Sequence, residues 1–326
     1  EAVARTGLRS TVHAEDASMI ARNAAELRAA GRGDPITHAL SRPPVVEQAS
    51  VAQSLELARA AGARIGIAHC STPTAVDLVT RARADGVDAT VETCPHYLAL
   101  TEAEIERHGP YAKINPALRR EELVAGLWER LNRGEIDYLG SDHSPFLVEE
   151  KEPFWQDMWG ASPGAPGLES LLPLMLTAVA ERRISLERMV ELTAGTAARV
   201  FGLPAKGAIR VGADADLVLV DLARPTTIEV ARWRSKSRGT ARIWDGRPVA
   251  ATILGTWVRG RAVWRDGELL GELSALLQSC AAEPLFETLR SVLQTPAVLD
   301  LLPQVGMIDH QIDKAGSAQA LDLPDD

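Results

Sequence analysis

The segment "DYLGSDHSPF", from Asp137 to Phe146, gives the first indication of the fold. Its apolar start is typical of a short buried strand, and it runs directly into an acid and an imidazole, Asp142 and His143. The Ser-Pro pair that follows prevents the strand from continuing. The segment therefore places two reactive side chains at the end of a predicted strand.

Upstream stretches have a similar form. "LRSTVHAED" is a β-prone run that ends at His13, "ARIGIAHCS" ends at His69, and "VDATVETCPHYL" is a third predicted strand. Helical patterns lie between the strands, as in Ala17–Ala30 and Arg120–Asn132, while "GRGDPITHALSRPP" is predicted to be a loop. Strands that alternate with helices indicate βα units and a parallel sheet, and four such units are visible.

The pattern changes after Gly202. "KGAIRVGADADLVLVDL" and "PVAATILGTWVRGRAVWRDGEL" alternate Val, Ile, Leu and Trp with Arg, Asp and Gly, which predicts strands of a small β domain. From Leu273 the pattern is helical again, and it ends in a polar tail predicted to be disordered. We therefore expect three regions, residues 1–202, 203–272 and 273–326.

Composition excludes several classes of protein. The 326 residues carry a net charge of −9, which argues against a nucleic-acid binder or a binder of anionic membranes. No apolar run approaches the roughly 20 residues that a membrane helix needs. Cys70, Cys94 and Cys280 form no CxxC pair, and no signal-peptide pattern follows Glu1. The reducing cytoplasm is the expected location.

The strand ends carry the candidate chemistry. His13, His69 and Asp142 come from three different predicted strands, and the carboxyl ends of parallel strands meet at one edge of a sheet. Two imidazoles and a carboxylate are suitable ligands for zinc or a similar divalent ion. A single His at a strand end is more often a hydrogen-bonded structural residue, so spacing alone leaves both interpretations open.

Seven local sequences occur in a characteristic order: "VHAED", "IAHCST", "ETCPHYL", "KINPALR", "GSDHSPF", "GAPGLESLLPLML" and "KGAIRVGADADLVLVD". Together they resemble the cyclic amidohydrolases, the branch of the metal-dependent amidohydrolases that contains dihydroorotase, allantoinase and hydantoinase. The resemblance covers Leu8 to Glu272. It implies an α/β fold with the last four units of a TIM-type (β/α)8 barrel, followed by a small β-sandwich-like domain.

The resemblance also implies roles for these residues. His13 and His69 match ligands of the second of two metal ions, expected to be Zn²⁺, and Asp142 matches the ligand of the first ion that also carries the proton. Activated water would then open a cyclic amide ring. His143 either orients Asp142 from the substrate side or caps the loop.

Weaker matches concern the substrate. Asn115 matches a contact to the cyclic amide, although a turn residue before Pro116 is the simpler interpretation. Gly164 and Gly167 match a loop that closes over the ring, and the alternative is a flexible connector. His38 is predicted to be a surface or loop residue.

Departures from the family pattern are equally informative. The HxH pair of the family's first strand and the metal-bridging lysine of its fourth strand have no counterpart. We therefore expect the C-terminal half of a larger enzyme, a homo-oligomer when complete. A chain with only three of six expected ligands would instead bind metal poorly, or be a non-catalytic relative.

Substrate preference can be predicted in part. Phe146 stands where the dihydroorotases carry a His that helps to bind the substrate carboxylate, and an apolar ring cannot do this. "SDHSP" and "MWG" are similar to allantoinase, whereas "NPALR" and "SKSRGT" favour dihydroorotase. Pro163 replaces an Asn that many relatives carry. A hydantoin-type ring such as allantoin is the preferred small-molecule substrate, with dihydroorotate as the alternative.

Overall fold

A computed structural model describes residues 1–270 of the chain. Residues Glu1–Gly267 form one compact unit, and a second unit begins at Glu268. The helical and polar tail predicted from Leu273 lies outside the described residues, and the predicted boundary at residue 202 stays a prediction. Within the described residues, no helix is long and apolar enough to cross a membrane.

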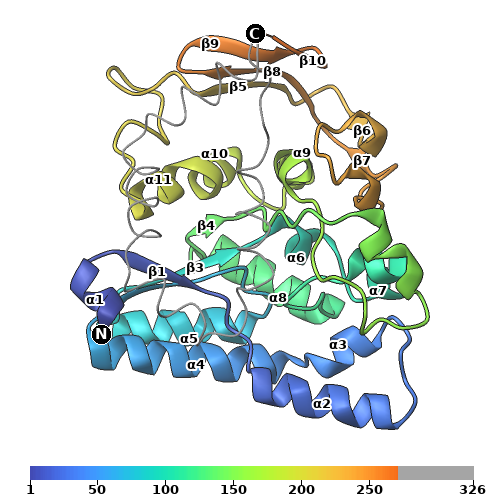
Figure 1. Cartoon of the computed structure of the whole chain (residues 1–326). Coiled ribbons are helices and arrows are strands. Elements are labelled where there is room, and N and C mark those ends of the chain that lie inside the picture. The colour runs from blue at the N-terminus through green and yellow to red at the C-terminus, as the bar shows by residue number, and fades with distance from the viewer. Residues whose placement is uncertain (271–326) are drawn as a thin grey trace, which may run out of the picture. The chain divides into compact units, whose positions relative to one another are not determined.

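A parallel sheet of four strands organises the first part of the unit (Figure 1). Its strands, in spatial as well as chain order, are β1 (Arg9–Val12), β2 (Arg64–Ile67), β3 (Ala89–Thr93) and β4 (Tyr138–Leu139). All three neighbouring pairs are parallel. The predicted α/β class and the four predicted strands are confirmed, although β4 is only two residues long.

Helices connect successive strands, and their ends follow local sequence signals. The side chain of Asp16 accepts a hydrogen bond from Met19 N at the start of α2, and Thr72 caps α5 in the same way. Gly62, with a φ of 61°, ends α4 in the left-handed conformation that glycine tolerates best. The principal helices are α2 (Ala17–Ala29), α4 (Pro44–Ala61), α5 (Pro73–Ala84), α8 (Glu121–Asn132) and α9 (Leu168–Ala180).

Short helical segments complete this part. The α-helices are α1 (Ala2–Thr6), α3 (Thr37–Ser41), α6 (Pro95–Ala99), α7 (Ala103–His108), α10 (Leu186–Val190) and α11 (Thr196–Val200). A π-helical turn (Glu191–Gly195) joins α10 to α11, and 3-10 turns cover Gly109–Ala112, Val148–Glu150, Glu152–Phe154, Val230–Arg232 and Arg238–Thr240. The predicted loop "GRGDPITHALSRPP" thus contains α3, which its Gly and Pro content concealed.

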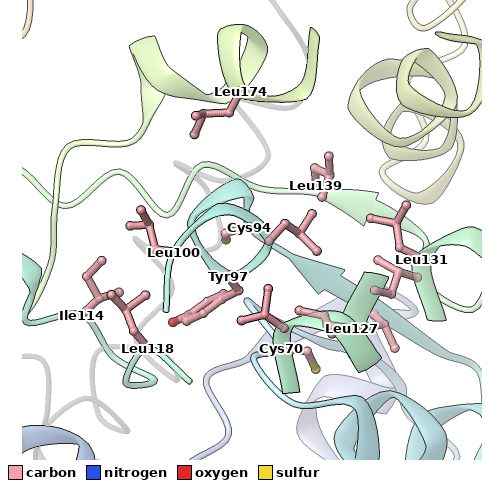
Figure 2. Packing of buried hydrophobic residues seen from close by; sticks show 14 of the residues in the cluster. Cys70, Cys94, Tyr97, Leu100, Ile114, Leu118, Leu127, Leu131, Leu139 and Leu174 are labelled. Carbon is pink, nitrogen blue, oxygen red and sulfur yellow. The ribbon is translucent and has the colours of Figure 1, made fainter. Parts of the chain in front are cut away.

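The hydrophobic core lies between the sheet and the helices that pack on it. Leu127 and Leu131 of α8, Leu139 of β4 and Leu174 of α9 all belong to one buried cluster (Figure 2). Cys70 and Cys94 are fully buried in the same cluster as small apolar groups. This packing fixes the sheet, and with it the positions of the residues that follow each strand.

The later strands pair in antiparallel fashion. β8 (Thr252–Val258) pairs with both β5 (Leu217–Asp221) and β9 (Arg261–Arg265), and β6 (Thr226–Thr227) pairs with β7 (Pro248–Val249). β10 (Glu268–Leu269) follows in the second unit. β5 and β7 to β10 fall within the two stretches predicted to form strands, whereas β6 lies outside them, and the small β domain stays a prediction.

Candidate metal and catalytic site

The candidate site lies just beyond the carboxyl ends of the parallel strands. His13 directly follows β1, His69 follows β2 after one intervening residue, and Asp142 follows β4 after two. His69 has a φ of 36° and Asp142 a φ of 44°, so both lie in the left-handed region that non-glycine residues rarely adopt. Such backbone is concentrated at functional sites, where the surrounding structure holds it in place.

The structure brings His13 and His69 together. His13 Nδ1 lies 3.0 Å from His69 Nε2, and the two rings meet edge to face with an interplanar angle of 70°. His69 is buried, and burial lowers its pKa to about 4, with a further contribution from the positive charge that His13 can carry. The neutral imidazole is the form that binds metal ions.

These two nitrogen atoms fit a metal centre. Zinc–nitrogen distances of about 2.05 Å and tetrahedral angles place two ligand nitrogens about 3.3 Å apart. The observed separation of 3.0 Å is close to that value. Among residues 1–270 no three His, Cys, Asp or Glu side chains group closely enough to hold an ion by themselves. His13 and His69 could therefore hold an ion only together with further ligands.

Asp142 lies within electrostatic reach of this pair. Burial raises the pKa of its carboxyl group, and the charge of His13 acts in the opposite direction. None of the arginines or lysines described in the structure forms an ion pair with Asp142. A carboxyl group with a raised pKa and no fixed cation can take up and release a proton, which is the property required of a general acid and base.

Glu92 of β3 is a site residue that sequence reasoning missed. Its carboxylate accepts a hydrogen bond from the backbone N–H of His69 at 3.3 Å and packs against Gly140, where an added Cβ would lie 2.5 Å from Oε1. Burial raises the pKa of Glu92 to about 7, and the negative charge of Asp142 raises it further. A charged residue in the middle of the predicted buried strand "ATVET" was the available signal.

Glu15 and Arg42 are further residues that were missed. Glu15 Oε2 lies 3.0 Å from His13 Nε2, and the same oxygen forms an ion pair with Arg42. Burial favours the neutral carboxyl, but the hydrogen bond with His13 and the charge of Arg42 outweigh it and lower the pKa of Glu15. The carboxylate is ionised and almost fully buried, with 2% of its side chain exposed.

His143 contacts the loop that precedes α9. Its Nδ1 accepts hydrogen bonds from the backbone N–H groups of Gly167 at 3.2 Å and Leu168 at 3.4 Å. This geometry supports the loop-capping interpretation and leaves Nε2 to carry the proton. Burial lowers the pKa of His143. Its role toward a substrate stays a prediction.

Gly164 and Gly167 lie tightly against the segment after β4. A Cβ on Gly164, which has a φ of 139°, would lie 2.3 Å from Ser144 Cβ, and a Cβ on Gly167 would lie 2.2 Å from Ser141 O. Both positions therefore require glycine for close backbone approach. A flexible connector, the alternative interpretation of this segment, would not need such close contacts at these two glycines.

Two more polar residues can be placed. Asn115 Oδ1 is buried and has no hydrogen-bond partner among the described residues, so it can accept a hydrogen bond from a ligand. His38 was predicted to be a surface or loop residue, and that prediction is wrong. His38 is buried in α3, where its Nε2 lies 2.8 Å from Ile114 O, because the helix packs onto the segment that leads to Asn115.

Comparisons with known proteins agree with this geometry. The model of the amidohydrolase family matches residues 4–263. The chain is 40% identical over 272 residues to L-hydantoinase of Paenarthrobacter aurescens, which covers 83% of this chain and 59% of that protein. It is 36% identical to an allantoinase of Deinococcus radiodurans, covering 82% of this chain and 58% of the relative.

Solved structures show the same similarity. L-hydantoinase (dihydropyrimidinase) from Arthrobacter aurescens superposes with a TM-score of 0.80 at 40% identity, over 83% of this chain and 60% of that one. A D-hydantoinase superposes with a TM-score of 0.78 at 35% identity. The chain thus spans somewhat more than half of the length of these relatives. By family model, identity and fold, the chain belongs to the amidohydrolase family, in its cyclic amidohydrolase branch.

Proposed function

We propose that the protein containing this chain is a metal-dependent hydrolase that opens a cyclic amide ring. The observation that carries the proposal is the approach of His13 Nδ1 to His69 Nε2 at the carboxyl edge of the parallel sheet, beside the buried carboxyl group of Asp142. In this proposal β1 to β4 are the last four strands of a (β/α)8 barrel, and the later strands belong to a β-sandwich-like domain. The L-hydantoinase and allantoinase relatives support the reaction class.

His13 and His69 would hold the metal, proposed to be one of two zinc ions, and Asp142 would contact the other. When bound, such ions lower the pKa of water and polarise a carbonyl oxygen. Asp142 takes the proton from the attacking water and returns it to the amide nitrogen that leaves the ring. The position of Asp142 after β4, at the same edge of the sheet as His13 and His69, suits both transfers, because one carboxyl group beside the reacting water can accept a proton and then donate it.

Other residues of this chain would position the ring. The unpaired Asn115 Oδ1 can accept a hydrogen bond from a ring N–H group. Gly164 and Gly167 keep the covering loop close to the residues after β4, and His143 fixes that loop through two backbone N–H groups. These contacts act through shape and hydrogen bonds, which is how enclosed sites orient small polar ligands.

A hydantoin-type ring is the proposed substrate class. A Cβ added to Gly164 would lie 2.8 Å from Cε2 of Phe146, so the Phe146 ring packs against this glycine. The ammonium group of Lys151 lies over the same ring, 5.6 Å from its centroid. An aromatic ring there favours a flat, uncharged cyclic amide over a ring that bears a carboxylate. Dihydroorotate is the alternative substrate. A homo-oligomeric, cytoplasmic enzyme completes the proposal.

The decisive experiment assays the product of the whole gene, including any sequence encoded before Glu1. Ring opening of hydantoin, allantoin and dihydroorotate is measured before and after treatment with a chelator, while metal content is measured by elemental analysis. We expect ring opening of a hydantoin-type substrate, loss of activity with the chelator and recovery with Zn²⁺. Activity that persists in metal-free protein would refute the mechanism. Absence of activity on all three rings in metal-loaded protein would favour the non-catalytic relative.

A further inference from the structure

His13 has a hydrogen-bond partner on each ring nitrogen. Its Nε2 lies 3.0 Å from Glu15 Oε2, and its Nδ1 lies 3.0 Å from His69 Nε2. A neutral imidazole carries one proton, so one nitrogen must donate and the other must accept. Which nitrogen donates depends on whether Glu15 Oε2 donates or accepts.

Glu15 can only accept. Its Oε2 atom contacts both His13 and Arg42, and an ionised carboxylate beside a guanidinium has no proton to give. The exposed fraction of the side chain is 17% for Arg42 and 2% for Glu15, so this ion pair is shielded from solvent. The proton of neutral His13 therefore lies on Nε2, and the lone pair of Nδ1 faces His69.

A second set of hydrogen bonds holds the backbone at Arg42. Its backbone carbonyl accepts a hydrogen bond from Arg119 Nη1 at 2.5 Å, and Arg119 Nε donates to Ser71 Oγ at 2.9 Å. Ser71 in turn donates to Glu47 through its backbone N–H at 2.7 Å and its hydroxyl at 2.6 Å. This buried chain of contacts fixes the backbone at Arg42, from which the side chain reaches Glu15.

We propose that Glu15 and Arg42 are positioning residues that lock His13 in its Nε2–H form and thereby present Nδ1 as the metal-binding nitrogen. The first half of this proposal concerns the metal-free protein alone, and the second half rests on the proposed function. Carboxylates that accept from the far nitrogen of a ligating His fix both its tautomer and its ring orientation.

His69 is not fixed in this way. Its Nδ1 is buried and has no hydrogen-bond partner among the described residues. When His13 is neutral in the metal-free protein, the Nε2–H of His69 donates to His13 Nδ1, since that nitrogen then carries no proton. His13 is thus preset as a ligand, whereas His69 must move its proton to Nδ1, or lose it, before its Nε2 can bind.

Nitrogen-15 NMR of the metal-free protein tests the tautomer directly, because long-range proton–nitrogen spectra distinguish the two neutral forms of each His. The His13 signals are assigned by their loss in a His13→Asn variant. We expect the Nε2–H form in the wild-type protein. Observation of the Nδ1–H form for His13 would overturn the proposal without any variant of Glu15.

Variants then test the metal-binding half. Glu15→Gln removes the negative charge and sets an amide against Arg42, and we expect Zn²⁺ affinity to fall by about 10- to 100-fold in competition with a chromophoric chelator. Asp137→Asn is the matched control, because Asp137 forms a partly buried ion pair with Arg83 that lies outside this chain of contacts and touches neither His. It should leave the His13 tautomer and Zn²⁺ affinity near their wild-type values.

If Glu15→Gln does not fold, Arg42→Lys provides a milder change. This substitution keeps the positive charge beside Glu15 but removes the planar guanidinium with its several N–H donors. A smaller loss of affinity is expected for it. Equal losses in the Glu15 and Asp137 variants would show a general structural effect and overturn the positioning role. A wild-type protein that has the predicted tautomer but binds no Zn²⁺ would instead refute the proposed function and leave the hydrogen-bond assignment intact.

Discussion

Replacing Gly167 with Ala tests whether the loop before α9 positions the catalytic segment. The added methyl carbon would lie 2.2 Å from Ser141 O, where non-bonded heavy atoms prefer about 3.5 Å. The two backbones must therefore separate by roughly 1 Å. Ser141 directly precedes Asp142, so the separation moves the proposed proton carrier.

The expected magnitudes follow from this contact. Gly167 has a φ of −124°, which alanine adopts freely, so the effect arises from crowding alone. Overpacking of this kind costs about 2 kcal/mol, or about 3 °C in Tm for a chain of this size. A displacement of about 1 Å in a catalytic group lowers kcat by about 100-fold.

Urea and thermal unfolding measure the stability, and ring opening by the complete gene product measures kcat and KM. Gly134→Ala is the control: with a φ of 81° it carries backbone strain, yet no atom lies within 4 Å of the added carbon. It should lose about 1 kcal/mol and keep its activity. The reasoning is wrong if Gly167→Ala keeps wild-type kcat, or if both variants lose activity in proportion to their lost stability.

Three further outcomes are expected. Asp142→Asn should abolish ring opening while Zn²⁺ content and Tm stay measurable, and residual activity above about 1% of wild type would exclude Asp142 as the proton carrier. Burial lowers the pKa of Lys151 to about 7 and that of Lys113 to about 8, from the ordinary value of 10.5. At pH values between each lowered pKa and 10.5, the unfolded chain therefore binds more protons than the folded chain. Stability should therefore rise with pH from 7 to 9, by at most about 1.4 kcal/mol per pH unit for each lysine, and Lys151→Met should flatten that rise in a pH series of Tm values. Trp244→Phe removes the indole N–H that donates to Pro166 O at 2.8 Å, and the buried carbonyl left unpaired should cost about 2 kcal/mol in urea unfolding.

Much of the fold could be predicted because its signals are local. The end of α4 is marked by Gly62, and the strand before His69 is an apolar run that a parallel sheet buries on both faces. α3 could not be predicted, because its first turn follows Asp34-Pro35 and its residues are held by contacts far along the chain. His38 is buried for the same reason: its partner Ile114 is 76 residues away.

The candidate site divides in the same way. His13 and His69 were predicted from their places after strands, and the structure brings their rings together. Their supporting residues were not predicted, because Arg42 reaches Glu15 across 27 residues of sequence and no local pattern encodes that pair. Side chains that orient the reactive groups depend on tertiary packing, so sequence position alone does not identify them.

The carboxyl groups near the strand ends differ in whether a guanidinium group lies beside them, and this difference indicates separate roles. Glu15 is buried beside a guanidinium, which keeps its pKa low, so it stays ionised and can only accept. Asp142 and Glu92 are also buried, but no such partner offsets the burial, and the pKa of each is raised. Environments that push the pKa values of neighbouring acids apart separate a structural anion from a group that exchanges protons. Glu15 is therefore assigned to hold the geometry of His13, and the proposed proton transfer falls to Asp142, whose negative charge also raises the pKa of Glu92 on the adjacent strand.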